Sequence, residues 1–355
     1  MSEAPAPPLP LVTAELPGSG GRLRATPEDF RVDEVPAYLP SGAGPHLYVR
    51  IEKRGRTTRD ALRAIARVLG VPERDAGYAG MKDRDAVTTQ WLSFPAAKDP
   101  DPRTLEAQGL AVLEVSRHAN KLRPGHVRAN RFAVGVRGGE LAAARACAAA
   151  LAERGLPNFF GPQRFGTDGG NAAVGRALLK GEATPEARRA GRDRFLRRLS
   201  ISAWQSSLFN RWLAERMADG LFAAALRGDI LKKLDTGGLF TCEDPAVDGP
   251  RVARFEVSPA GPMFGHKLRA AEGDAGAREA RLLEAEGLGP ADLARGGGEA
   301  EGTRRAARLK VELALEPLTE GEGGYLARFE LPKGSYATVV MRELMKVEGE
   351  LPDEE

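Results

Sequence analysis

The sequence of 355 residues predicts an α+β fold, in which a mixed β-sheet flanked by helices is interrupted by a long insertion. Strand-like segments alternate with helical ones in the first part of the chain, helical patterns dominate the middle, and strand patterns return near the end. We therefore expect one domain built from residues 1–155 and 309–355, with residues 156–308 inserted into it. This irregular mixture differs from the repeated strand–helix units of a dinucleotide-binding fold.

The first domain is expected to begin with an extended, Pro-rich arm over residues 1–20, followed by a strand, a Pro-Glu-Asp turn and a second strand. Apolar residues at helical spacing predict a helix over 57–69, with Thr57 or Thr58 as its N-cap. An Ala-rich helix is expected over 140–154. Alternating residues predict further strands at 46–52, 87–92 and 132–136.

The insertion is expected to be mainly helical. A long helix is predicted over 196–213, and residues 270–308 have a helical composition with a flexible break at glycines 296–298. Strand patterning resumes at residue 309. A strand over 325–331 and a helix over 338–346 follow, and the acidic tail after them is expected to be solvated.

Composition excludes several classes of function. The net charge of +3 is too small to indicate a nucleic-acid-binding protein by itself. The two cysteines and four histidines show neither metal-ligand spacing nor a disulfide framework, so no metal site is expected. Without a secretory pattern or an apolar run of membrane-spanning length, we expect a soluble cytoplasmic protein with no membrane contact and no obligate protein partner.

Two segments concentrate positive charge. Residues 115–139 contain no acidic residue but several Arg and Lys, and a cluster between Arg188 and Arg198 contains a single acid, Asp193. Basic stripes of this kind suit a phosphate backbone. We expect RNA-backbone contacts from four residues of the first segment: Arg117, Lys121, Arg123 and Arg128. For the second cluster, an Arg-rich composition explains the pattern equally well.

The segment from Gly77 to Ser93, GYAGMKDRDAVTTQWLS, is the most informative part of the chain. A turn flanked by Gly77 and Gly80 leads into Lys-Asp-Arg-Asp and then into an alternating strand. A carboxylate at the edge of a strand, between two cations, can be kept ionised and directed into a cleft. On charge pattern alone, a solvated surface turn is the more common explanation of such a run.

Several motifs, in the same order along the chain, resemble those of the TruD family of tRNA pseudouridine synthases. The first is Gly80-x-Lys82-Asp83-x-x-Ala86-x-Thr88-x-Gln90-x-x-Ser93. The other matching segments are 27–30, 130–132, 158–166 and 332–338. The resemblance covers nearly the whole chain and is weakest over about 219–305. It implies a pseudouridine synthase catalytic domain at 1–155 and 309–355 and a family-specific TRUD insertion domain at 156–308.

The resemblance implies an isomerase that converts uridine 13 of tRNA (RNA numbering) to pseudouridine without cofactor, metal or energy source. The sequence carries no dinucleotide motif, and its Gly-rich run at 166–170 lacks the Lys-Ser/Thr ending of a phosphate loop. One carboxylate must act on the ribose, either as a nucleophile at C1′ or as a general base at C2′. By motif position this is Asp83. Asp85 is the competing acid, at a variable position of the pattern.

An ionised carboxylate in a partly dry cleft needs a cationic partner. Arg24 stands where the family carries a basic residue, three positions before Pro27, and we expect it to be the charge partner of Asp83. Neighbouring side chains of an extended backbone point to opposite faces, so Lys82 is expected to contact a phosphate of the substrate instead.

A uracil that leaves its stack needs an aromatic wall and polar groups for its edge. The resemblance implies Phe30, Phe132 and Tyr336 as the aromatic residues and Asn130 as the polar one. Phe132 stands where most other pseudouridine synthase families use Tyr. Taken singly, a strand Phe usually belongs to the core, and an Asn before a strand usually belongs to a turn.

Two other functions compete with this hypothesis. An RNA-binding or RNA-chaperone protein would explain the basic segments, but it would have no use for a buried Asp83 facing phosphates. The same isomerase acting on another RNA is compatible with the sequence, because substrate choice depends on surface shape and charge. The segment 158–166 is expected to be architectural, packing the insertion against the catalytic domain, rather than catalytic.

Overall fold

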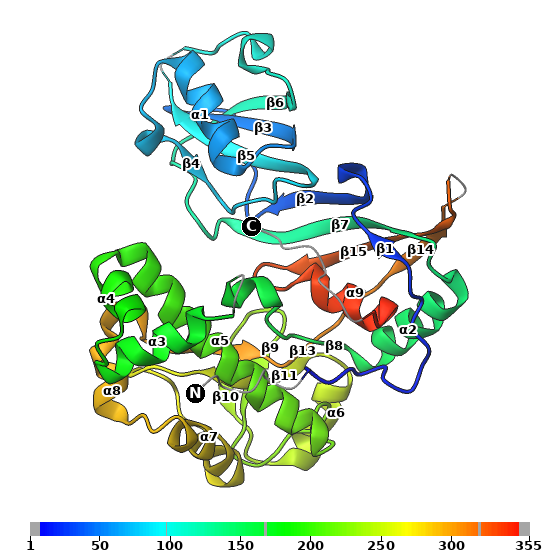
Figure 1. The fold of residues 1–355 in the computed structure, drawn as a ribbon, viewed down its shortest axis with the longest axis vertical. Helices are drawn as coiled ribbons and strands as arrows, with labels where there is room; N and C mark the ends of the chain where they lie inside the picture. The colour runs from blue at the N-terminus through cyan, green and yellow to red at the C-terminus, as the bar shows by residue number, and fades with distance from the viewer. Residues whose placement is uncertain (1–7, 97, 167–168, 319–320, 348–355) are drawn as a thin grey trace. The chain divides into compact units, whose positions relative to one another are not determined.

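The structure is a computed structural model that describes residues 8–96, 98–166, 169–318 and 321–347. It divides into two compact units (Figure 1). The sheet unit comprises Leu16–Ala149 and the described residues from Val311 onward. The inserted unit comprises Ala150–Lys310 and the described residues before Leu16. The acidic tail and the centre of the Gly-rich run lie outside the described residues, as does the beginning of the expected arm.

The sheet unit contains a mixed sheet whose described part has nine strands. Its main path runs β14-β15-β7-β2-β5-β3-β6, with β1 paired to β7 and β4 paired to β5. β2 and β5 are parallel, and the other pairs are antiparallel. The strands are β1 (Arg22–Leu23), β2 (Phe30–Pro36), β3 (His46–Arg54), β4 (Gly77–Tyr78), β5 (Val87–Pro95), β6 (Leu110–His118), β7 (Val127–Arg137), β14 (Ala314–Pro317) and β15 (Gly324–Pro332). The predicted α+β class is confirmed.

Helix α1 (Thr58–Leu69) covers the outer part of this sheet (Figure 1). Its N-cap is Thr57, one of the two expected residues, and the Asp60 amide donates to the Thr57 hydroxyl. Its apolar face packs on alternate residues of β3 and on β5. The other helices of the sheet unit are α2 (Leu141–Arg154), which continues into the inserted unit, and α9 (Ala337–Met345), with short 3-10 turns η1 (Pro27–Asp29), η2 (Glu73–Asp75) and η3 (Pro102–Leu105).

Strand β7 begins five residues earlier than the predicted strand at 132–136. It is longer because β2 pairs with residues 127–134 on one side and β15 pairs with residues 129–137 on the other. Asn130 and Phe132 therefore both lie inside a central strand, and the interpretation of Asn130 as a turn residue does not apply.

The inserted unit combines helices with a second, four-stranded sheet of order β10-β9-β11-β12. Its helices are α3 (Asn171–Lys180), α4 (Pro185–Arg192), α5 (Arg194–Ala218), α6 (Pro245–Ala253), α7 (Gly273–Ala285) and α8 (Pro290–Arg295), with 3-10 turns η4 (Pro162–Phe165) and η5 (Gly297–Glu299). Its strands are β8 (Leu156–Pro157), β9 (Ile230–Lys233), β10 (Leu239–Thr241), β11 (Val257–Met263), β12 (Thr303–Ala306) and β13 (Arg308–Leu309).

The sequence analysis missed this second sheet, and its helical interpretation of 270–308 is wrong for β12. The central strand, β11, has the sequence VSPAGPM and is buried on both faces, so it shows no alternation that could reveal a strand. Among the described residues, no helix is both long and apolar enough to cross a membrane.

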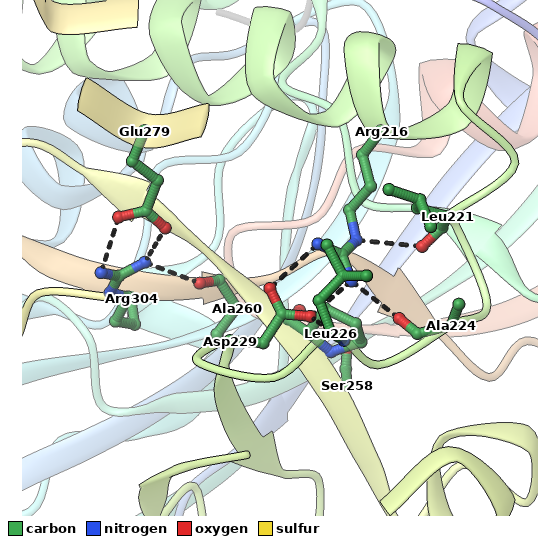
Figure 2. Close-up of polar contacts among 10 residues, drawn as sticks. Arg216, Leu221, Ala224, Leu226, Asp229, Ser258, Ala260, Glu279 and Arg304 are labelled. Atoms are coloured by element: carbon green, nitrogen blue, oxygen red, sulfur yellow. Dashed lines mark hydrogen bonds and ion pairs between the residues drawn. The ribbon is translucent and has the colours of Figure 1, made fainter. Parts of the chain in front are cut away.

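Two buried ion pairs join elements of the inserted unit (Figure 2). Arg216 of α5 contacts Asp229 at 2.6 and 3.0 Å and donates to the carbonyl oxygens of Leu221 and Ala224. Arg304 of β12 pairs with Glu279 of α7, at 2.9 Å for the longer contact. Because each guanidinium also donates to backbone carbonyls, the desolvation of these charges is compensated by several hydrogen bonds.

We expect Asp229→Ala to lower the free energy of unfolding by about 3 kcal/mol or more, because it leaves the Arg216 guanidinium buried without its counter-ion. Urea unfolding followed by circular dichroism measures this change. The matched control is Glu215→Ala, which removes an exposed partner of Arg211 on the same helix and should cost less than about 0.5 kcal/mol. Equal costs for the two variants would contradict the assigned importance of the buried pair.

Candidate active site

The candidate site is built around Asp83, which lies in the connection between β4 and β5. The residue is 6 % exposed, and its Oδ2 lies 2.7 Å from Nη2 of Arg24. Its Oδ1 accepts a hydrogen bond of 2.9 Å from the Asp85 amide. Asp85 itself is exposed. The structure thus brings together the two residues expected to form a charge pair, and it places the competing acid on the surface.

The Arg24–Asp83 contact is a charge pair whose atoms are not aligned as a hydrogen bond. Catalytic contacts are often poorly aligned before the substrate binds. A carboxylate oxygen that is close to a cation but not committed to a linear hydrogen bond keeps lone pairs for an incoming group. This arrangement suits a nucleophile or a general base.

Arg24 reaches Asp83 from a strained backbone. Its φ of +54° lies in the left-handed region, which costs a non-glycine residue about 1–3 kcal/mol. The guanidinium lies over the Phe30 ring, 4.2 Å from its centroid, where a cation–π attraction holds it. Asp29 stabilises the 3-10 turn between Arg24 and Phe30, because its carboxylate accepts a hydrogen bond from the Thr26 amide. The matching segment at 27–30 therefore positions the cation.

Lys53 of β3 is a candidate that the sequence analysis missed. It has no exposed surface, and its ammonium donates to the carbonyl oxygens of Arg56, at 2.7 Å, and of Asp83. Burial lowers the pKa of Lys53 to about 8, and the negative charge of Asp83 opposes this shift. The period-two alternation of Leu47, Val49 and Ile51 continues to position 53, so it could have revealed that this lysine faces the core.

The environment of Lys82 differs from the expected contact with a phosphate. Its ammonium donates to Glu34 Oε2 at 2.8 Å, and the side chains of Lys82 and Glu34 are 6 % and 0 % exposed. An ammonium held in a buried ion pair is not presented to a phosphate. Here Lys82 anchors the loop to β2.

The Asp83 loop is further held to α1 and β5 by side-chain hydrogen bonds. The Lys82 amide donates to the Thr58 hydroxyl at 2.8 Å, and Thr58 donates to Gln90 at 2.9 Å. The side-chain amide of Gln90 in turn donates a hydrogen bond to the Gly80 carbonyl at 3.2 Å. Thr58 and Gln90 are each 1 % exposed, so these bonds form out of water and fix the position of the loop.

Two of the expected pocket residues, Phe132 and Asn130, share one face of the sheet with Phe30. Phe132 lies opposite Val32 and contacts Phe30 edge-on, with 6.2 Å between the ring centroids. Asn130 lies two residues along the same strand, and its Oδ1 is buried without a hydrogen-bond partner among the described residues. The Thr88 hydroxyl, from β5, is buried and unpartnered in the same sense. Unsatisfied buried polar atoms are costly and mark where a ligand could bind.

Comparison with known proteins agrees with this geometry. The model of the family described as "tRNA pseudouridine synthase D (TruD)" matches residues 9–190 and 191–344. The chain belongs to the TruD family of tRNA pseudouridine synthases. The resemblance inferred from the motifs is thereby confirmed.

The chain is similar over nearly its whole length to curated members of the TruD family. A tRNA pseudouridine synthase D of Anaeromyxobacter sp. (strain Fw109-5) is 81% identical over 344 residues, which cover 97% of this chain and 98% of that protein. A tRNA pseudouridine synthase D of Thermus thermophilus is 45% identical over 347 residues, which cover 96% of this chain and 92% of that protein. The crystal structure of a putative TruD of Methanosarcina mazei superposes with a TM-score of 0.74 at 25% identity, and the match covers 95% of this chain and 96% of that one.

Three of the remaining expected site residues, Tyr336, Arg123 and Arg128, lie near the start of β7, whereas Arg117 is on β6. Tyr336 is the half-buried N-cap of α9, four residues after β15. Arg123 and Arg128 are exposed, although Arg128 lies 3.7 Å from Glu330. Arg117 is largely buried and donates to Asp99 at 2.7 Å, so it is less open to a phosphate than expected.

The TruD-like segment 158–166 is fastened within the inserted unit. Asn210 of α5 exchanges two hydrogen bonds with the backbone of Phe160, at 2.8 and 2.9 Å. Arg305 of β12 lies over the Phe160 ring at 4.0 Å and donates to the Asn158 carbonyl at 2.9 Å. These contacts join the segment to a helix and a strand of the inserted unit.

Lys53 should make the free energy of unfolding rise with pH between about 8 and 10. Its pKa of about 8 in the folded protein is below the ordinary value of about 10.4, so the unfolded chain binds more protons in this window. The cost of burying the charge is fully present below pH 8 and is relieved as the pH rises. We expect wild type to gain on the order of 1 kcal/mol over Lys53→Met across the window.

Urea unfolding at several pH values measures this difference. Lys98→Met is the control, because it removes an exposed lysine of the same unit and should keep the wild-type pH dependence. Parallel pH profiles for wild type and Lys53→Met would show that Lys53 has an ordinary pKa.

Proposed function

We propose that this TruD-family pseudouridine synthase isomerises uridine 13 of tRNA, with no cofactor or metal, by means of Asp83 and a flipped-out base. The observation that carries the proposal is the buried Arg24–Asp83 pair inside the loop that bears the family motif. A buried carboxylate that is paired with a cation and carried by the loop with the family motif is a candidate for an acid–base or nucleophilic role.

The reaction exchanges the bond from ribose C1′ to uracil N1 for a bond from C1′ to C5. In the nucleophilic route, Asp83 attacks C1′ and uracil leaves with the bonding electrons. In the alternative route, Asp83 takes the C2′ proton and a glycal remains. In both routes the uracil turns and C5 bonds to C1′. This displaces the Asp83 carboxylate from C1′ in the first route, and in the second route C2′ takes its proton back from Asp83. The C5 proton then passes to solvent while N1 gains one. Both routes use a carboxylate that is charged, fixed and close to the ribose.

The polar groups on the Phe30 face supply a means of holding the base while it turns. Asn130 Oδ1 and the Thr88 hydroxyl can bond to the amide edge of uracil, which offers one donor between two acceptors. We propose that the rings of Phe30, Phe132 and Tyr336 form the wall. Phe30 is 2 % and Phe132 is 6 % exposed, so Phe30 contributes mainly by holding the Arg24 guanidinium. The half-buried Tyr336 is the better candidate for stacking.

Asp83→Asn should reduce pseudouridine formation by roughly a hundredfold or more while the affinity for tRNA stays within a few-fold. Carbodiimide primer extension on an unmodified tRNA transcript gives both the extent and the position of modification. Asp85→Asn is the matched control, since it changes the exposed acid two residues away. EDTA added after the tRNA has folded tests metal independence in the same assay.

Near-normal turnover of a folded Asp83→Asn protein would contradict the assignment and direct attention to Asp85. Modification at another position with wild-type protein would contradict uridine 13 but not the family chemistry. Tight binding of tRNA without any modification would favour the alternative of an RNA-binding protein.

Arg123→Ala/Arg128→Ala should weaken tRNA binding and reduce the slope of log affinity against log salt by about 0.7 to 0.9 for each lost phosphate contact. Both side chains are exposed, so folding should be unaffected. Arg67→Ala/Arg145→Ala removes the same charge from two exposed helical positions of the same unit and serves as control. Tyr336→Ala should lower the rate about tenfold without changing the slope. If Tyr336→Ala changed the salt slope and the arginine variant did not, Tyr336 rather than the arginines would be assigned to the phosphate backbone.

A further inference from the structure

A hollow of about 640 Å³ in the sheet unit lies away from the Asp83 site. It is formed by the residues after β2, the first residue of β3 and the connection between β6 and β7. β3 runs from His46 at this hollow to Lys53 at the Asp83 loop. Seven residues of strand separate the two places, which corresponds to about 23 Å. The volume is in the range of small-molecule sites.

The hollow favours an anion. Lys121, Arg123 and three of the four histidines of the protein line it, and none of the described lining residues is acidic. The connection that supplies most of them belongs to the acid-free stretch 115–139. Arg123 is exposed, and Lys121 uses one of its donors on the Arg74 carbonyl at 3.0 Å, which leaves two. These groups suit a phosphate.

Two of the imidazoles accept hydrogen bonds at Nδ1. The Ser41 amide donates to His118 Nδ1 at 3.2 Å, and the Arg123 amide donates to His126 Nδ1 at 3.4 Å. An amide can only donate, so both Nδ1 atoms accept and each neutral ring carries its proton on Nε2. His46 Nδ1 is buried without a partner among the described residues. Burial, with the charges of Lys121 and His118, lowers the pKa of His46 below its ordinary value.

The hollow also offers flat and apolar surface. The rings of Tyr38 and His118 are stacked, with centroids 5.0 Å apart and planes at 26°, and His126 meets Tyr38 edge-on at 5.4 Å. Leu39, at the rim, is 72 % exposed. A bare phosphate or an acidic peptide would leave these surfaces unused, whereas a nucleotide has both an anionic and a flat part.

We propose that this hollow binds an unpaired nucleotide of the RNA substrate, with its phosphate against Lys121 and Arg123 and its base against Tyr38 and His118. This inference rests on the proposed action on tRNA, but it concerns a second contact that takes no part in the chemistry. It would hold the RNA at a fixed distance from Asp83.

Imidazole NMR signals of the full-length protein provide the test, because three of the four histidines line the hollow and His266 lies in the inserted unit. Hexauridylate should shift the signals of His46, His118 and His126 and leave that of His266 in place. His→Gln variants assign the signals. His118→Ala should weaken hexauridylate binding on the order of tenfold. Lys121→Ala should lower the salt slope by about 0.7, and Arg67→Ala should change neither quantity.

The competing occupants give different results. Equal shifts with inorganic phosphate at the same concentration would reduce the hollow to an anion site and overturn the nucleotide proposal. Shifts with poly-glutamate but not with hexauridylate would identify a protein-binding surface instead. The absence of any shift with hexauridylate would also overturn the nucleotide proposal. Asp83→Asn should show the wild-type shifts, so this contact and the proposed catalytic role can fail independently.

Discussion

The candidate site depends on keeping a carboxylate and a guanidinium together out of water. Removing two charges from water costs several kcal/mol each, and a single contact at 2.7 Å does not compensate for that by itself. The surrounding structure supplies the rest. The Asp85 amide bonds to the carboxylate, and the Phe30 ring lies against the guanidinium. The left-handed backbone of Arg24 then adds strain that this packing must overcome.

Most residues of the family motif therefore hold the Asp83 loop in position. Gln90 and Thr58 hold it to α1, and the buried Lys82–Glu34 pair holds it to β2. Ser93 accepts from the Leu122 amide at 2.9 Å and so ties β5 to the connection after β6. Within the motif, Asp83 presents the carboxylate for the proposed chemistry, and Thr88 presents a hydroxyl to the proposed base pocket. A motif in which most positions support a few functional positions is what preorganisation of a site requires.

Much of the fold and the central pair could be predicted from the sequence, because strand alternation, helix caps and motif order are local signals. The α1 cap at Thr57 is an example of a local signal. The contact between Arg24 and Asp83 is not local, and its prediction depends on the family resemblance. Two features could not be predicted. The second sheet has central strands without alternation. The burial of Lys82 depends on its ion pair with Glu34, 48 positions away, and a local sequence pattern cannot predict such a distant partner.

Strand β3 gives the two proposed sites a common frame, with Lys53 at one end and His46 at the other. Backbone hydrogen bonds to β5 and β6 run along its length, so the separation of about 23 Å is set by covalent geometry. A folded RNA presents two unpaired nucleotides at a fixed spacing, whereas a flexible strand must lose conformational entropy to do so. Selection by spacing needs no reading of base edges, which agrees with the recognition of folded RNA by shape.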